Sequence, residues 1–125
     1  MLTERAPRWV AWWFRGAAVY GTAALLVSLL RPASTPPALM AQLAFVGTAL
    51  AFQIVFWIIG GDPVRHRPLM LAAVAEKLAF GVPGLALAGS PGIAAAILPL
   101  AVIDLVLGVG FLIAWSVTAD RIGKG

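Results

Sequence analysis

The chain has 125 residues, of which 62% are hydrophobic and only 11% charged, with a formal net charge of +4 and no cysteine. Soluble domains are about 45–50% apolar and about 25% charged. The composition therefore excludes most soluble enzymes and nucleic-acid-binding modules, and the lack of cysteine excludes disulfide scaffolds and cysteine-ligated metal sites.

Four long hydrophobic runs follow one another along the chain, at residues 9–30, 38–60, 68–88 and 93–116. A helix needs roughly 20 apolar residues to cross a bilayer, and backbone groups in lipid must be hydrogen-bonded within their own segment. Each run is therefore predicted to be a transmembrane helix. The length of the first run and the charge of Arg15 within it favour a retained span over a cleaved signal peptide.

Short polar segments separate the runs. Residues 31–37 contain three prolines, which lack a backbone donor, so this stretch is predicted to be a loop; residues 61–67 and 89–92 are glycine- and proline-rich turns. Such short connections predict an all-α, integral membrane fold, a single domain over residues 1–125 with four helices in an antiparallel up-down-up-down bundle. Pro83 and Pro99 are predicted to free a carbonyl inside the third and fourth helices, as is common in membrane helices.

Positive charge is distributed unequally between the two sides of this bundle. One side carries Arg5, Arg8, Arg65, Arg67, Arg121 and Lys124. The other side carries Arg31. By the positive-inside rule, both termini are predicted to be cytoplasmic.

The tryptophans fall on the same side as the basic residues. They are Trp9, Trp12, Trp13, Trp57 and Trp115. Because an indole ring prefers the membrane–water interface, we interpret these residues as interface anchors. The alternative is a docking surface for a partner protein or for anionic lipid headgroups.

Polar residues within the hydrophobic runs are costly, since a charge in the bilayer centre costs at least about 2.5 kcal/mol. They are Arg15, Gln53, Glu76, Lys77 and Asp104. We expect them to face the bundle interior as one cluster, because small residues share their helix faces. Glu76 and Lys77 are sequence neighbours that diverge by about 100°, so Arg15 is predicted to pair with Glu76 or Asp104, and Lys77 with the other carboxylate.

Two roles for this cluster stay open. The ions can hold four apolar helices in one register, or they can form a polar pocket, open to the cytoplasm, that binds a headgroup, a quinone or a small ion, or relays a proton. We expect no catalytic residues, cofactor or metal site, since the chain has one histidine, His66 in a loop, and no nucleophile–base pair.

Several short motifs resemble small bacterial four-helix membrane proteins of the DoxX-like kind. They are Asp62-Pro63, Arg65-His66-Arg67-Pro68-Leu69, Lys77-Leu78 and Asp104-Leu105. The resemblance implies a membrane-embedded bundle, in some members linked to quinone-dependent redox systems. This chain departs from the pattern in having Glu76 where a small residue is expected, and its lack of cysteine argues against thiol chemistry.

The chain is also similar in length to four-helix multidrug exporters, which depend on a glutamate in their first helix. Here that helix carries Arg15, a cation that would repel cationic drugs.

These observations predict a non-catalytic protein of the bacterial inner membrane. The first hypothesis is an accessory or stabilising subunit of a larger membrane complex. The alternative is a binding protein or small transporter for a lipophilic, quinone-like or small ionic ligand that uses the buried charge cluster. The expected partners are membrane lipids, other membrane proteins or a second copy of the chain, a possible quinone or lipid ligand, and no nucleic acid.

Overall fold

The computed structural model describes residues 6–119, and within this range it has four α-helices. They are α1 (Arg8–Ser28), α2 (Pro36–Gly61), α3 (Arg67–Ala86) and α4 (Ile97–Val117). All four are long and apolar enough to cross a membrane, so the prediction of an all-α chain with four such helices is confirmed. Three of the predicted basic residues, Arg5, Arg121 and Lys124, lie outside the described residues.

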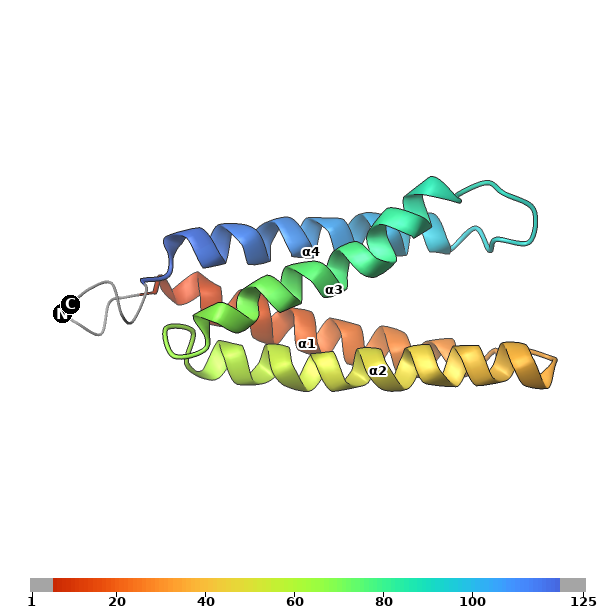
Figure 1. Cartoon of the computed structure of the whole chain (residues 1–125), viewed down its shortest axis with the longest axis horizontal. Coiled ribbons are helices and arrows are strands. Elements are labelled where there is room, and N and C mark those ends of the chain that lie inside the picture. The colour runs from red at the N-terminus through yellow and green to blue at the C-terminus, as the bar shows by residue number, and fades with distance from the viewer. Residues whose placement is uncertain (1–5, 120–125) are drawn as a thin grey trace.

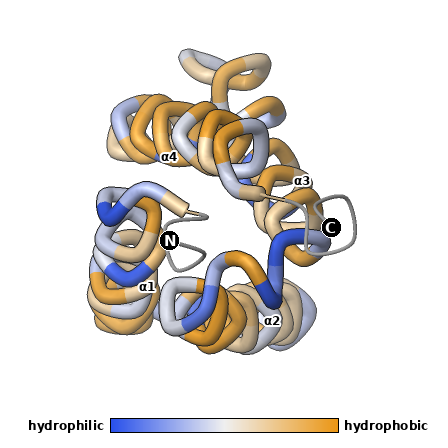
Figure 2. The backbone as a smooth tube through the Cα atoms, turned by 90° about the vertical axis from the view of Figure 1, so that its left-hand side faces the viewer, coloured by the Kyte–Doolittle hydropathy of each residue, from blue (hydrophilic) through white to orange (hydrophobic). Residues whose placement is uncertain are grey.

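The helices lie side by side and the chain reverses direction at each loop (Figure 1). One end of the bundle, here called the terminal end, carries the start of α1, the α2–α3 loop and the end of α4. The opposite end, here called the loop end, carries the α1–α2 and α3–α4 loops. Seen from the terminal end, α1, α2, α3 and α4 are arranged around the axis of the bundle in chain order (Figure 2).

Helix α4 begins later than predicted, at Ile97 rather than residue 93. The preceding loop contains Gly89 and Gly92, whose φ angles of 84° and 85° lie in the left-handed region that glycine adopts at little cost. Pro99 consequently falls in the first turn of α4, where a missing N–H removes no helical hydrogen bond. The prediction that Pro99 frees a carbonyl inside the helix is wrong.

Helix α2 begins earlier than predicted, because Pro36 and Pro37 belong to its first turn rather than to the loop. Thr35 is the N-cap, and its side-chain oxygen accepts a hydrogen bond of 3.3 Å from the backbone N–H of Ala38. Pro83, in contrast, lies inside α3 as predicted.

The buried core is concentrated at the terminal end. Phe14 of α1 stacks on Phe111 of α4 with ring centroids 4.2 Å apart, and Phe56 of α2 lies 5.0 Å from Phe111. Most helix–helix contacts join α1 to α2 and α3 to α4, so the bundle consists of two helical hairpins. Figure 1 shows the hairpins converging at the terminal end and separating toward the loop end.

Large apolar side chains cover the outside of all four helices. Examples are Val19 and Leu26 on α1, Ile54 on α2, Val82 on α3 and Val109 on α4, each more than half exposed. In water such a surface would be strongly unfavourable, whereas lipid chains solvate it well.

Candidate functional site

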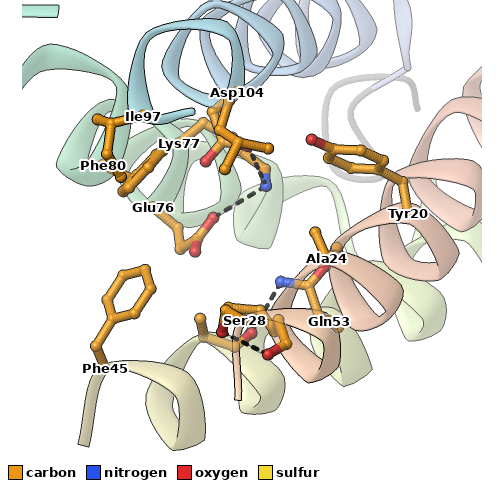
Figure 3. Close-up of a pocket in the computed structure, with 14 residues that line it drawn as sticks. Tyr20, Ala24, Ser28, Phe45, Gln53, Glu76, Lys77, Phe80, Ile97 and Asp104 are labelled. Carbon is orange, nitrogen blue, oxygen red and sulfur yellow. Dashed lines mark hydrogen bonds and ion pairs between the residues drawn. The ribbon is translucent and has the colours of Figure 1, made fainter. Parts of the chain in front are cut away.

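A cavity of about 150 Å³ lies between the two hairpins, in the part of the bundle where they separate. Every helix contributes to its lining (Figure 3). The lining residues are Tyr20, Gly21, Ala24, Leu25, Ser28, Phe45, Ala49, Gln53, Glu76, Lys77, Phe80, Ile97, Leu100 and Asp104.

The local sequence explains why space remains here. On the α1–α2 side the lining includes Ala24 and Ala49, whose side chains are too small to reach across to the other hairpin. Toward the terminal end, the phenylalanine cluster that includes Phe56 fills the centre, and the Lys77 ammonium lies 5.2 Å from the centre of the Phe56 ring. The cavity therefore ends at Lys77 and Phe56.

Three charged side chains meet at this closed end. The Lys77 ammonium lies 3.4 Å from Oδ1 of Asp104, to which it donates a hydrogen bond, and 3.5 Å from Oε1 of Glu76. Lys77 is only 2% exposed, and these two carboxylates are the charged groups that compensate the cost of burying its ammonium. Among residues 6–119, no three histidine, cysteine or acidic side chains are grouped so that they could hold a metal ion.

Gln53 is the buried polar residue of the opposite hairpin. It is 4% exposed and its amide nitrogen donates a hydrogen bond of 2.8 Å to the carbonyl oxygen of Ala49, one turn earlier in α2. Its side-chain oxygen, Oε1, is buried and has no hydrogen-bond partner. Gly21 permits this position, because a Cβ at residue 21 would overlap the Gln53 side chain.

Aromatic side chains complete the walls. Phe45 of α2 and Phe80 of α3 lie with ring centroids 5.9 Å apart and bridge the two hairpins. On the other side, the Tyr20 hydroxyl points toward Asp104 and Lys77 (Figure 3). The site thus combines an ion cluster, an unpartnered acceptor and three aromatic rings around a space of ring size.

Compared with known proteins, the chain matches no family model, no curated protein and no solved structure. The resemblance to DoxX-like proteins stays a prediction, and the chemistry of the site has to be argued from its own residues.

The predicted pairing within the cluster is wrong. Lys77 contacts both carboxylates, including that of its neighbour Glu76, because the two side chains are long enough to meet although their Cβ atoms diverge. Arg15 contacts neither: its guanidinium lies 4.3 Å above the Trp57 ring, and its Nε donates a 3.4 Å hydrogen bond to the Trp57 carbonyl oxygen. The structure therefore brings together Glu76, Lys77 and Asp104, with Gln53 facing the same cavity, and leaves Arg15 apart.

The cavity also extends toward the side opposite to the one expected for the predicted pocket. The lining extends to Ser28 in the last turn of α1 and to Ile97 at the start of α4, both at the loop end. The phenylalanine core closes the terminal end. The cavity does not extend toward the side of the chain termini as expected, because the phenylalanine core fills that end of the bundle.

The tryptophans predicted as anchors all lie toward the terminal end but differ in surroundings. Trp12 is 76% exposed, whereas Trp9 and Trp57 are 39% and 47% exposed. Trp13 has a role inside the bundle, since its ring N–H donates a 3.1 Å hydrogen bond to the carbonyl oxygen of Leu107 in α4. Trp115 lies under the guanidinium of Arg67, 4.4 Å from ring centre to Cζ.

Three aromatic residues of the site were not predicted: Tyr20, Phe45 and Phe80. Tyr20 could have been predicted from the sequence. It is the chain's one tyrosine, and its hydroxyl lies within an apolar run, where a polar group needs a partner. Phe45 and Phe80 carried none, since phenylalanine in a membrane helix faces lipid as readily as a cavity.

Proposed function

We propose that this chain is a non-catalytic, multi-pass protein of a bacterial inner membrane, with both termini on the cytoplasmic side. The exposed apolar side chains on every helix support insertion. Arg8, Arg65 and Arg67 lie at the terminal end, whereas the loop end has Arg31, which supports the orientation. The bacterial membrane follows from the DoxX-like resemblance.

Within that membrane, the protein binds a small amphipathic molecule between its hairpins. The proposal depends chiefly on Gln53, which lines the cavity and whose buried side-chain oxygen, Oε1, lies against Gly21 and has no hydrogen-bond partner. An unpaired polar group in an apolar interior costs about 1–3 kcal/mol, and a ligand that donates a hydrogen bond would remove this cost. The apolar walls would hold the rest of the molecule.

The size of the cavity limits the part of the ligand that enters it. An engineered protein cavity of about 150 Å³ accommodates a benzene molecule, and this cavity has a similar volume of about 150 Å³. A single ring or a short branched group with one polar substituent would fit. A longer apolar tail would extend from the loop end toward the lipid.

Native mass spectrometry of the protein, extracted gently from its own membrane, tests this function. We expect a small-molecule adduct on the wild type that is lost when Ala24→Phe fills the cavity. Ala23→Phe is the matched control, because Ala23 lies on the exposed face of α1 and does not line the cavity. An adduct that survives Ala24→Phe would contradict the proposal.

The same spectrum tests the accessory-subunit role predicted from the sequence. Release in fixed stoichiometry with larger proteins, with no adduct, would favour that role over ligand binding.

A further inference from the structure

The charges that line the cavity do not balance. Glu76 and Asp104 supply two carboxylates and Lys77 supplies one ammonium, so the cluster carries a net charge of −1 when all three are ionised. Arg15 does not compensate it, because its guanidinium lies over Trp57 and is not part of the lining. In a low-dielectric interior an uncompensated charge attracts an opposite one strongly.

Two polar atoms near the cavity that have no hydrogen-bond partner also favour a positively charged ligand. One N–H of the Gln53 amide donates to Ala49, and its oxygen Oε1 is an acceptor without a partner. Oε1 of Glu76 is buried and likewise makes no hydrogen bond, although Lys77 lies at ion-pair distance. Both of these unpartnered atoms are acceptors, so a ligand that brings donors would satisfy them.

The aromatic walls also favour a cation. Tyr20, Phe45 and Phe80 line the space, and the negative faces of aromatic rings attract cations. Positive groups already use this interaction in the bundle, where Lys77 lies over Phe56 and Arg67 over Trp115.

From these features we infer that the ligand is a monovalent organic cation, a protonated amine attached to a ring-sized apolar group. The ammonium occupies the space between the Glu76 carboxylate and the Gln53 side chain, which lie on opposite sides of the cavity (Figure 3), and the apolar group lies against the aromatic walls. This inference rests on the proposed function and specifies its ligand. Arg15 was expected to repel a cationic ligand, but its guanidinium lies over Trp57 and does not line the cavity, so it does not argue against a cation here.

Cysteine protection in lipid nanodiscs tests the inference. The chain contains no cysteine, so Ala24→Cys introduces one thiol into the cavity, and Ala94→Cys introduces one into the α3–α4 loop as a control. Both are modified with a water-soluble methanethiosulfonate reagent in the presence of benzylammonium, benzyl alcohol or benzoate. These three water-soluble probes share one ring and differ in charge.

We expect benzylammonium to protect Cys at position 24 at a concentration about tenfold lower than benzyl alcohol, with benzoate weakest. Adding Glu76→Gln should reduce the preference for the cation to less than about threefold, while Asp62→Asn, in the exposed α2–α3 loop, should leave it unchanged. The thiol at position 94 should react at the same rate throughout.

The outcomes separate the two proposals. Equal protection by benzylammonium and benzyl alcohol would overturn the cation inference and leave ligand binding intact. No protection by any probe would overturn both. The three probes are compared on the Ala24→Cys variant, which keeps Glu76. Their order of protection therefore tests the inference even if Glu76→Gln fails to fold.

Discussion

At the scale of single residues, the cluster is organised by Lys77, which holds two carboxylates from different helices. Its ammonium lies 3.5 Å from Glu76 and 3.4 Å from Asp104. A buried charge stripped of its partner typically destabilises a protein by about 3–5 kcal/mol. If Lys77 is replaced by a neutral residue, the carboxylates of Glu76 on α3 and Asp104 on α4 lose the cation that lies between them.

We therefore predict that Lys77→Met lowers the unfolding free energy by about 3–5 kcal/mol. Combining it with Glu76→Gln and Asp104→Asn should restore much of the loss, because no unpaired charge is left. Thermal unfolding in detergent, followed by far-ultraviolet circular dichroism, measures both effects. Arg31→Met, in the exposed α1–α2 loop, is the control, and an equal loss in both single variants would contradict the assigned role.

The sequence predicted which polar residues face inward better than it predicted their partners. Helical periodicity and small neighbours place Lys77 and Gln53 correctly in the interior, where both are buried. Periodicity sets the direction of the Cβ atom, not the position of a charge several bonds away. Lys77 therefore reaches its neighbour Glu76, and Arg15 reaches a tryptophan ring at the end of α2.

At the scale of the elements, an arginine–tryptophan contact joins the two helices within each hairpin. Arg15 of α1 lies over Trp57 of α2, and Arg67 of α3 lies over Trp115 of α4. In both pairs the arginine Nε also donates to the carbonyl oxygen of the same tryptophan, near the carboxyl end of the helix, where a cation is favourable. Each pair fixes the terminal end of its hairpin.

Arg67→Lys should weaken the α3–α4 hairpin, because an ammonium cannot stack as a plane on Trp115 or reproduce the Nε hydrogen bond of 3.0 Å. The expected loss of unfolding free energy is about 0.5–2 kcal/mol. Arg65→Lys, two residues away on an exposed position, should change stability little. Chemical unfolding of the two variants in the same detergent compares them, and equal stabilities would show that the contact contributes nothing.

The boundaries of the elements were predicted less well than their existence. Hydropathy counts an apolar residue whether or not it is helical, so residues 93–96 were included in the fourth span although the helix begins at Ile97. The start of the second helix was predicted too late, because Pro36 and Pro37 were assigned to the loop. They lie in the first turn of α2, where a backbone N–H is not needed for a helical hydrogen bond.

At the scale of the whole molecule, the unequal filling of the two ends creates the site. Small residues at helical spacing predict close packing between helices. Helices α3 and α4 do pack closely, because a Cβ added at Gly84 would lie only 2.7 Å from the Cβ of Ala101. Between the hairpins, Ala24 and Ala49 instead leave the cavity open. Hydrophobic patterning does not distinguish these outcomes, because both faces consist of small apolar residues.

The side of the membrane that the cavity faces determines where its ligand comes from. If the positive charge of the α2–α3 loop holds the terminal end in the cytoplasm, the loop end and the cavity mouth face outward. An impermeant thiol reagent added to intact cells should then modify Ala94→Cys in the α3–α4 loop, and modify Val64→Cys in the α2–α3 loop only after permeabilisation. The reverse pattern would invert the orientation and give cytoplasmic ligands direct access to Glu76, Lys77 and Asp104 through the loop end.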